Sequence, residues 1–193
     1  MKRFAIVGAL LGAAGCGAGA GGACSVACGQ KSTCGSVGNN LTALGALEAA
    51  RAPAQSIVGG TPKWVGAFAG LKITRAGLPS MEPETQILGT TIYASGWVFK
   101  YCAGLDEVVF GAGPPDTTIE KGCGMFNCDA VASFTPPAVD SPAAVAAAFP
   151  SDPATTVYNV DLNLLAGPRV WSVTRRPNGP TVKVDADSGA VVP

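Results

Sequence analysis

Residues 158–164 read Tyr-Asn-Val-Asp-Leu-Asn-Leu, in which every second side chain is apolar and the others are polar. Side chains alternate between the two faces of a β-strand, so this stretch predicts a strand with one buried face and one wet face. Two further stretches, residues 171–174 and 182–186, repeat the alternation. The sequence therefore predicts a three-stranded antiparallel meander whose apolar face needs a cover.

A short helix before this meander is the expected cover. Ser141 is a good N-cap residue, and Pro142 suits the first helical position, where its missing N–H is not needed. Val145 and Phe149 lie one turn apart and give the helix an apolar face, and the proline that follows Phe149 ends it. The C-terminal part of the chain, residues 136–193, is therefore expected to form an α+β unit.

The part of the chain before it, residues 41–135, carries similar signals. Asn40 is expected to cap a helix that starts at Leu41, runs to about residue 51 and is ended by Pro53. Apolar alternation then predicts strands at residues 67–75, 86–94, 97–101 and 107–111. The last two of these are expected to form a hairpin, so this part is also interpreted as an α+β unit.

The two units are related by a weak internal repeat, because a gapless alignment places Trp97 on Trp171. The same alignment matches four further positions: Phe99 with Val173, Val108 with Val182, Phe110 with Val184, and Ala112 with Ala186. Two helix-plus-strands units follow from this alignment. The expected fold class is α+β, with short helices packed on antiparallel sheet.

Two segments of the C-terminal unit carry a recognisable pattern. Trp171-Ser-Val173 opens one strand, and the segment from Val182 to Val191 reads Val-Lys-Val-Asp-Ala-Asp-Ser-Gly-Ala-Val. With these segments, residues 140–192 resemble the PepSY family, a small extracytoplasmic α+β module with a Trp-x-Val strand and a closing Val-Asp-Ala-x-Thr-Gly-x-Val. Members of that family occur in protease propeptides and envelope proteins. The resemblance implies a binding or inhibitory module and transfers no catalytic residue.

The N-terminus has the pattern of a bacterial signal peptide, with two basic residues before a short apolar run. Residues 1–15 are interpreted as this leader, and the small residues before Cys16 resemble the lipobox of bacterial lipoproteins, in which that cysteine receives lipid. Residues 16–40, rich in Gly and Cys, would then be a lipid-anchored tether at the cell envelope, on the outer membrane if the cell is Gram-negative. The alternative is cleavage after Ala20, which would release a secreted or periplasmic soluble protein.

Cysteine usage is typical of an oxidising compartment. The chain has seven cysteines, and setting Cys16 aside leaves six candidates for disulfides: Cys24, Cys28, Cys34, Cys102, Cys123 and Cys128. Three lie in the N-terminal stretch and three in the body, so full oxidation requires at least one bridge between the two groups. A hairpin would bring Cys102 close to Cys123 or Cys128, and both pairings stay open. The alternative is a redox or metal-binding protein that uses Cys123 and Cys128, whose spacing differs from that of zinc ribbons and thioredoxin-like enzymes.

Composition limits the function further. The chain has no histidine, which excludes His-ligated metals and histidine-based catalysis. Lys+Arg and Asp+Glu number 13 each and neither sign forms a run, so no nucleic-acid partner is expected. We interpret the chain as a lipid-anchored binding module that contacts the membrane through its anchor and an envelope protein through its body. Neither enzymatic activity nor a cofactor or metal is expected.

Overall fold

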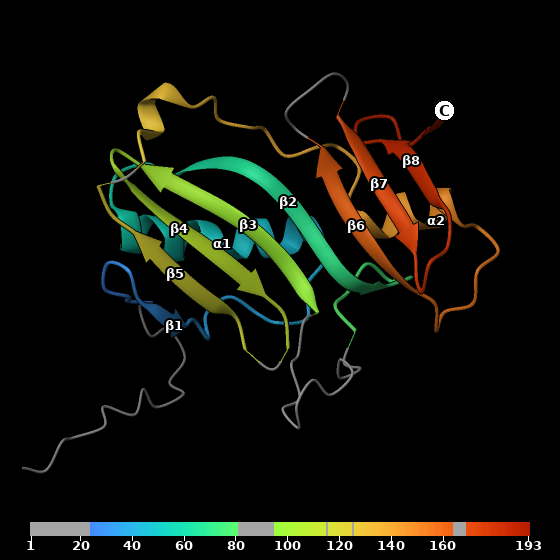
Figure 1. The fold of residues 1–193 in the computed structure, drawn as a ribbon, viewed down its shortest axis with the longest axis horizontal. Helices are drawn as coiled ribbons and strands as arrows, with labels where there is room; N and C mark the ends of the chain where they lie inside the picture. The colour runs from blue at the N-terminus through green and yellow to red at the C-terminus, as the bar shows by residue number, and fades with distance from the viewer. Residues whose placement is uncertain (1–23, 81–94, 115, 125, 164–168) are drawn as a thin grey trace, which may run out of the picture.

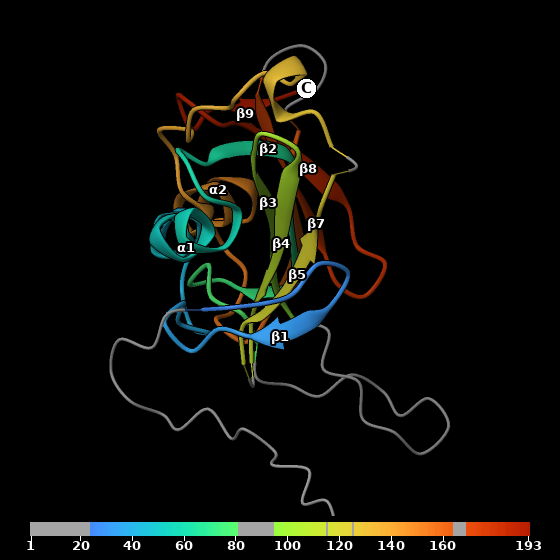
Figure 2. The same ribbon diagram turned by 90° about the vertical axis from the view of Figure 1, so that its left-hand side faces the viewer.

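The computed structural model describes residues 24–80, 95–114, 116–124, 126–163 and 169–193. These residues form an α+β fold, as expected, with a nine-stranded antiparallel sheet and two α-helices on one of its faces (Figures 1 and 2). The strands are β1 (Lys31–Thr33), β2 (Lys63–Thr74), β3 (Gly96–Ala103), β4 (Asp106–Ala112), β5 (Thr118–Gly122), β6 (Val157–Asn163), β7 (Val170–Arg175), β8 (Thr181–Asp185) and β9 (Val191–Val192). The expected leader, Cys16 and the expected strand at residues 86–94 lie outside the described residues.

The same order of helix and strands occurs twice along the chain. α1 (Ala43–Val58) precedes β2 to β5 and packs on β3 and β4, whereas α2 (Ser141–Ala148) precedes β6 to β9 and packs on β7 and β8. The strand order is β1-β5-β4-β3-β2-β6-β7-β8-β9, so the two sets of strands join where β2 pairs with β6. Both halves therefore share one continuous sheet, and Figure 2 shows both helices on the same side of it.

Trp97 and Trp171 occupy equivalent places in the two halves. Both are completely buried, and each indole N–H donates to a backbone carbonyl at 2.9 Å, that of Leu41 for Trp97 and that of Val139 for Trp171. Leu41 and Val139 each lie two residues before the first residue of a helix. The sequence match between the two tryptophans therefore corresponds to a structural equivalence.

The second strand of each hairpin departs from the gapless alignment. Trp97 pairs with Ala112 in β4, but Trp171 pairs with Val184 in β8 and not with Ala186. The chain between the paired positions is two residues shorter in the second hairpin, so the structural counterpart of Ala112 is Val184. A shift of two residues keeps every side chain on its expected face, and for that reason the apolar pattern could not reveal it.

α1 differs from the sequence prediction at both ends. Its N-cap is Thr42 and not Asn40, and the Thr42 side chain accepts a backbone N–H of the first turn at 3.3 Å. Pro53 lies inside the helix, although an internal proline disfavours a helix by about 3 kcal/mol. The helix continues because Ala54 and Ile57, beyond the proline, are buried in the core. Tertiary packing thus outweighs the local signal.

α2 begins one step earlier than expected. Asp140 is the N-cap, so Ser141 is the first helical residue and Pro142 the second. The Asp140 carboxylate accepts the Ser141 N–H at 2.6 Å, one of the first N–H groups of the helix, which have no partner within it. The helix ends at Ala148, one residue before the expected end, and Phe149 is its C-cap.

β6, β7 and β8 form the predicted antiparallel meander. On β6, Tyr158, Val160 and Leu162 are buried and alternate with the exposed Asp161 and Asn163 on the opposite face. The cover on the apolar face is α2, whose Ala144 and Val145 are completely buried in the same core. The prediction of one buried and one wet face is therefore confirmed.

Candidate functional site

The six cysteines predicted to form disulfides are paired in three bridges. Cys102 is bonded to Cys128 with their Cα atoms 5.7 Å apart, which selects one of the two pairings left open by the sequence. Cys28 is bonded to Cys123 (Cα–Cα 5.5 Å) and supplies the expected bridge between the N-terminal stretch and the body. The third bridge joins Cys24 to Cys34, with a Cα–Cα distance of 5.3 Å.

This pairing weighs against the alternative of a redox or metal site at Cys123 and Cys128. The two cysteines are not bonded to each other but belong to separate bridges. Cys128 and its partner Cys102 are both completely buried, so a thiolate cannot reach this bridge without local unfolding. The disulfides therefore brace the fold.

The sheet face opposite the helices, which we call the open face, carries the candidate binding site. On β3 it presents Val98, Lys100 and Cys102, which alternate with the buried aromatic side chains under the helices. Val98 is 41% exposed, and Leu71 of the adjacent strand β2 is 37% exposed. We call these two residues the apolar strip. On β6 the open face instead carries polar groups such as Asp161.

Asp161 marks the polar half of the open face. It pairs with Ala69 where β2 and β6 join the two halves of the sheet. Loss of water to the surrounding sheet raises the pKa of its carboxyl above the ordinary 3.8, although the residue as a whole is exposed. A partner that brings a cation or a hydrogen-bond donor to this position would compensate the carboxylate for that lost hydration.

Residues 126–139, which we call the connecting segment, lead from the β5 side of the sheet to α2 and cross above the ends of the strands (Figure 1). The segment begins with a short 3₁₀ helix, η1 (Cys128–Ala130). The Cys128 N–H donates to the Gly104 carbonyl at 2.9 Å, and Lys63 forms an ion pair with Asp129 at 3.6 Å. Together with the Cys102–Cys128 bridge, these contacts fix the start of the segment on the sheet.

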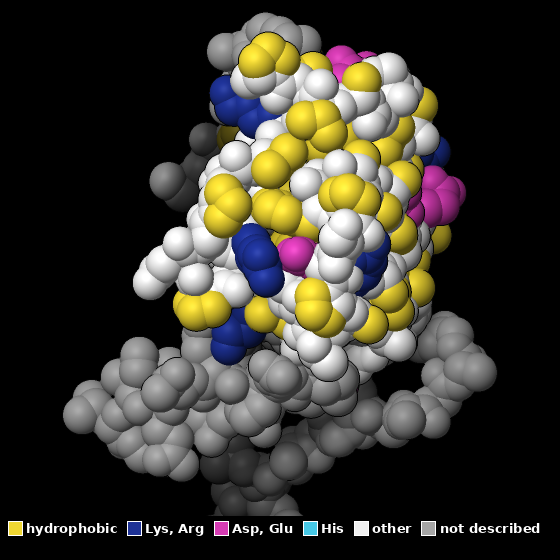
Figure 3. All heavy atoms as spheres, turned by 90° about the vertical axis from the view of Figure 1, so that its right-hand side faces the viewer, with side chains coloured by type: hydrophobic (Ala, Val, Ile, Leu, Met, Phe, Trp, Pro, Cys, Tyr) yellow, Lys and Arg dark blue, Asp and Glu magenta, His cyan; other side chains and the backbone are white. Residues whose placement is uncertain are grey.

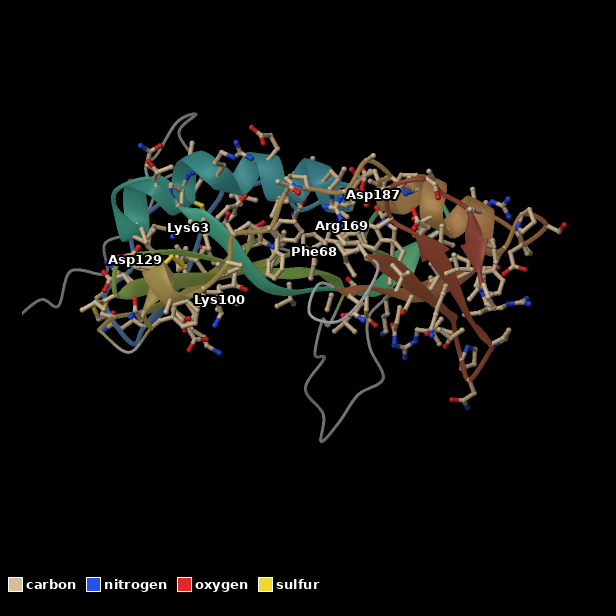
Figure 4. The ribbon with its side chains drawn as sticks, turned by 90° about the horizontal axis from the view of Figure 1, so that it is seen from above. Lys63, Phe68, Lys100, Asp129, Arg169 and Asp187 are labelled. Atoms are coloured by element: carbon tan, nitrogen blue, oxygen red, sulfur yellow. A yellow bond between two sulfur atoms is a disulfide. The ribbon has the colours of Figure 1, made fainter. Side chains whose placement is uncertain are left out.

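The rest of the connecting segment is held by both halves of the sheet. The Phe134 N–H donates to the Trp64 carbonyl at 3.0 Å, and the two aromatic rings meet edge to face with centroids 6.0 Å apart. Arg169 donates to the Thr135 carbonyl at 2.8 Å and forms an ion pair with Asp187. Figure 4 shows Arg169 and Asp187 next to each other near the middle of the molecule, well to the right of Lys63 and Asp129. The segment therefore straps the two halves together.

Two pockets open along β3. The first, which we call the segment pocket, has a volume of about 410 Å³ and is lined by Val65, Lys100, Phe126, Ala130, Val131, Ala132 and Phe134. The second has a volume of about 280 Å³ and lies at the apolar strip, with Leu71 and Val98 among its lining residues. Because Val98 and Lys100 share one face of β3, both pockets belong to the open face.

Lys100 is the charged group at the segment pocket. Its Nζ lies 2.7 Å from Oε2 of Glu107 on β4 and 5.0 Å from the centroid of the Phe126 ring. The ion pair and the cation–π contact hold the ammonium in place at the edge of an otherwise apolar cavity. This arrangement can offer an N–H donor to a ligand whose body is apolar.

The end of the molecule beyond β8 has mixed surface chemistry. Figure 3 shows basic and acidic side chains there, interspersed with hydrophobic ones. The Arg75 guanidinium donates to the carbonyls of Phe149 and Asp152 after the end of α2, and Arg175 forms an ion pair with Asp152 at 3.3 Å. The Arg75 charge lies near the C-terminal end of α2, where a cation is favourable. Arg75, Arg175 and Asp152 carry charges of both signs and so form no patch of a single sign.

Sequence reasoning identified only part of this site. The predicted strand at residues 97–101 contains Val98 and Lys100, but the sequence did not indicate that their face of the strand stays open. An apolar side chain at an exposed position of an alternating strand was the available signal for the apolar strip. It missed Phe126, Val131 and Phe134, because the segment around them has no periodic pattern. Their role depends on where the segment crosses the sheet.

Comparison with protein-family models, with curated proteins and with solved structures gives no match to this chain. The resemblance to the PepSY family therefore stays a prediction from the residues of the C-terminal unit. Of the helices in the described residues, none is long and apolar enough to cross a membrane. Within the same residues, no group of three or more His, Cys, Asp or Glu side chains is arranged to hold a metal ion.

Proposed function

We propose that this chain is an extracytoplasmic binding module that is held at the cell envelope by a lipid on Cys16 and engages an envelope protein through its open face. The signal-peptide pattern and the small residues before Cys16 support the anchor. Three disulfides are typical of proteins that fold in an oxidising compartment, and they support a location outside the cytoplasm.

The apolar strip is the observation that carries the binding role. Leu71 and Val98 are large apolar side chains, more than a third exposed, on a sheet face that neither described helix covers. Beside them lies the polar face of β6. An apolar centre next to polar groups is the usual composition of a protein–protein interface.

The PepSY resemblance supports the same class of function. It lies in the C-terminal unit, whose helix and meander pack as an α+β unit in the structure. Because the resemblance transfers no catalytic residue, it favours binding or inhibition over catalysis. We therefore assign no reaction to this chain.

Charge placed on the apolar strip tests the binding role. Photo-crosslinking in intact cells would compare the full chain with its Leu71→Lys and Val98→Lys variants, and a Leu105→Lys variant is the matched control because Leu105 is 59% exposed on the β3–β4 turn. We expect the first two variants to lose a crosslinked envelope partner that the control retains. Equal crosslinking by all variants, or none by the unchanged chain, would contradict the proposal.

The mass of the mature N-terminus tests the anchor separately. We expect a lipidated Cys16 as the first residue and a membrane-associated protein, and a Cys16→Ser variant that is released from the membrane. An unmodified N-terminus at Gly21 would contradict the lipid anchor and support the secreted alternative. That result would leave the role of the open face untouched.

A further inference from the structure

The segment pocket has the dimensions and walls of a small-molecule site. Its volume of about 410 Å³ lies within the range of roughly 300–1,000 Å³ that is usual for ligand pockets. Val65 lines it from β2, and Phe126 and Val131 line it from the connecting segment. These side chains pack in one apolar cluster with the buried Cys102–Cys128 bridge. The wall of the pocket next to the sheet is therefore apolar.

The walls of this pocket are fixed before any ligand arrives. The Cys102–Cys128 bridge ties the connecting segment to β3 directly beside the pocket. The Phe134 N–H bond to the Trp64 carbonyl, at 3.0 Å, holds the other side of the segment. A ligand would therefore not have to order the chain around it, which removes a large part of the free-energy cost of binding.

Lys100 determines which ligand chemistry fits. It is the one charged side chain among the seven that line the pocket, and the other six are apolar. Its ammonium group has three N–H donors, and Glu107 accepts from it at 2.7 Å, so donors are left for a second acceptor. A single carboxylate can share this cation with Glu107. A doubly charged phosphate would meet one cation and the nearby Glu107 carboxylate, and it is disfavoured.

We propose that the segment pocket binds a small amphiphile that has an apolar chain and one carboxylate, the chemistry of a medium-chain fatty acid. The chain lies against Val65, Phe126 and Val131, and the carboxylate accepts a hydrogen bond from the Lys100 ammonium. The segment pocket and the pocket at the apolar strip both lie on the open face but share no lining residue, so the segment pocket adds a small-molecule ligand to the proposed protein partner.

Calorimetric titration with decanoate, below its micelle concentration, tests the inference. The protein is the full chain with Cys16→Ser, which lacks the proposed lipid and can be handled without detergent. Decanol is the neutral probe of equal chain length. We expect saturable binding of decanoate with one molecule per chain, and weaker binding of decanol because it lacks the charge.

Four variants locate the site. Lys100→Met keeps the apolar stem, and we expect at least about tenfold weaker binding of decanoate with little change for decanol. Glu107→Gln should bind decanoate as well or better, since Lys100 no longer shares its charge. Ala132→Trp, at an exposed lining position, should fill the pocket and abolish binding of both probes. Lys183→Met, an exposed lysine of β8, is the matched control and should bind like the parent.

Thermal unfolding of each variant verifies that the fold is intact, and the Ala132→Trp change is tolerated because its side chain starts at the surface. Absence of saturable decanoate binding to the parent chain would overturn the inference. Full binding by Ala132→Trp, or equal decanoate affinity in Lys100→Met, would also overturn it. Decanoate binding in a Val98→Lys variant that has lost its protein partner would support it, because the two sites would then be independent.

Discussion

Asp140 accepts a 2.6 Å hydrogen bond from the Thr42 hydroxyl, although the two residues lie 98 positions apart in the sequence. Each of them is the N-cap of a helix, Thr42 of α1 and Asp140 of α2. The Asp140 carboxylate also accepts the Leu44 N–H of α1 at 3.0 Å and the Ser141 N–H of α2 at 2.6 Å. One negative charge therefore stabilises the N-terminal ends of both helices. It also links the two halves of the structure at equivalent positions, the N-caps of α1 and α2.

Replacing this shared cap should destabilise the protein more than replacing an ordinary cap. We expect Asp140→Ala to lower the free energy of unfolding by about 2 to 4 kcal/mol, since it removes about 1 to 2 kcal/mol of capping from each helix. Thr42→Ala should lower it by about 1 kcal/mol. Urea unfolding of the two single variants and the double variant measures these values. An Asp140→Ala loss no larger than that of Thr42→Ala would contradict the shared cap.

Even alanine at position 70 is expected to lower the stability of the protein. A Cβ atom on Gly70 would lie 2.2 Å from Cζ3 of Trp97, whose ring is completely buried against β2. We expect Gly70→Ala to lower the free energy of unfolding by about 1 to 3 kcal/mol through overpacking. Gly35→Ala is the control, because a Cβ there meets nothing within 4 Å.

The smaller Trp97→Leu side chain provides a second control for Gly70. Trp97→Leu should remove the clash with a Cβ at position 70. The free energy of unfolding of the double variant should therefore fall by less than the sum of the decreases in the two single variants. Additive losses would mean that Gly70→Ala acts through something other than the Trp97 ring. Thermal unfolding of the single and double variants measures the difference.

The three disulfides should differ in their resistance to reduction. Cys28 is exposed and Cys123 is partly exposed, whereas the other four cysteines are buried. We expect a mild thiol reductant to open the Cys28–Cys123 bridge first and the Cys102–Cys128 bridge last, as read by mass spectrometry of alkylated peptides. Reduction of the buried bridge before the exposed one would contradict the expected order.

Loss of the Cys28–Cys123 bridge should also carry a large free-energy cost. This bridge spans 95 residues of sequence, and a loop of that length contributes about 4 to 5 kcal/mol in the chain-entropy description. We expect a Cys28→Ser/Cys123→Ser variant to approach that loss in urea unfolding. The shorter Cys102–Cys128 loop, with a separation of 26, should contribute about 3.5 kcal/mol from chain entropy.

The alternation of apolar and polar residues predicted the strands that have one buried face. Sequence patterns failed for features that are determined by contacts between residues far apart in the chain. The hairpin around Trp97 and the meander after Tyr158 follow directly from period-two patterns. The end of α1 could not be predicted, because Pro53 is a stop signal that only burial of Ile57 overrides. The segment pocket could not be predicted either, since its walls come from a segment without periodicity that packs on Trp64.

Tyr101 gives the structure a defined response to alkaline pH. Its phenol is buried and donates to the Leu47 carbonyl at 2.7 Å, and burial raises its pKa from 10.0 to about 12. Below pH 10 the folded and unfolded states both keep the proton. Between pH 10 and pH 12 the unfolded state ionises and the folded state does not, so the free energy of unfolding should fall as pH rises, by about 2 to 3 kcal/mol in total.

Tyr101→Phe should separate this effect from the hydrogen bond itself. At neutral pH the variant should lose about 1 kcal/mol of stability with the bond to the Leu47 carbonyl. Above pH 10 its free energy of unfolding should fall less steeply than that of the parent, because it has no phenol to ionise at this position. Urea unfolding on both sides of pH 10, with phenolate absorbance of the two proteins compared, measures the slope. The difference in absorbance between the two proteins reports the ionisation of Tyr101 alone. If that ionisation has its midpoint near pH 10.0, Tyr101 is in contact with water, and its burial is contradicted.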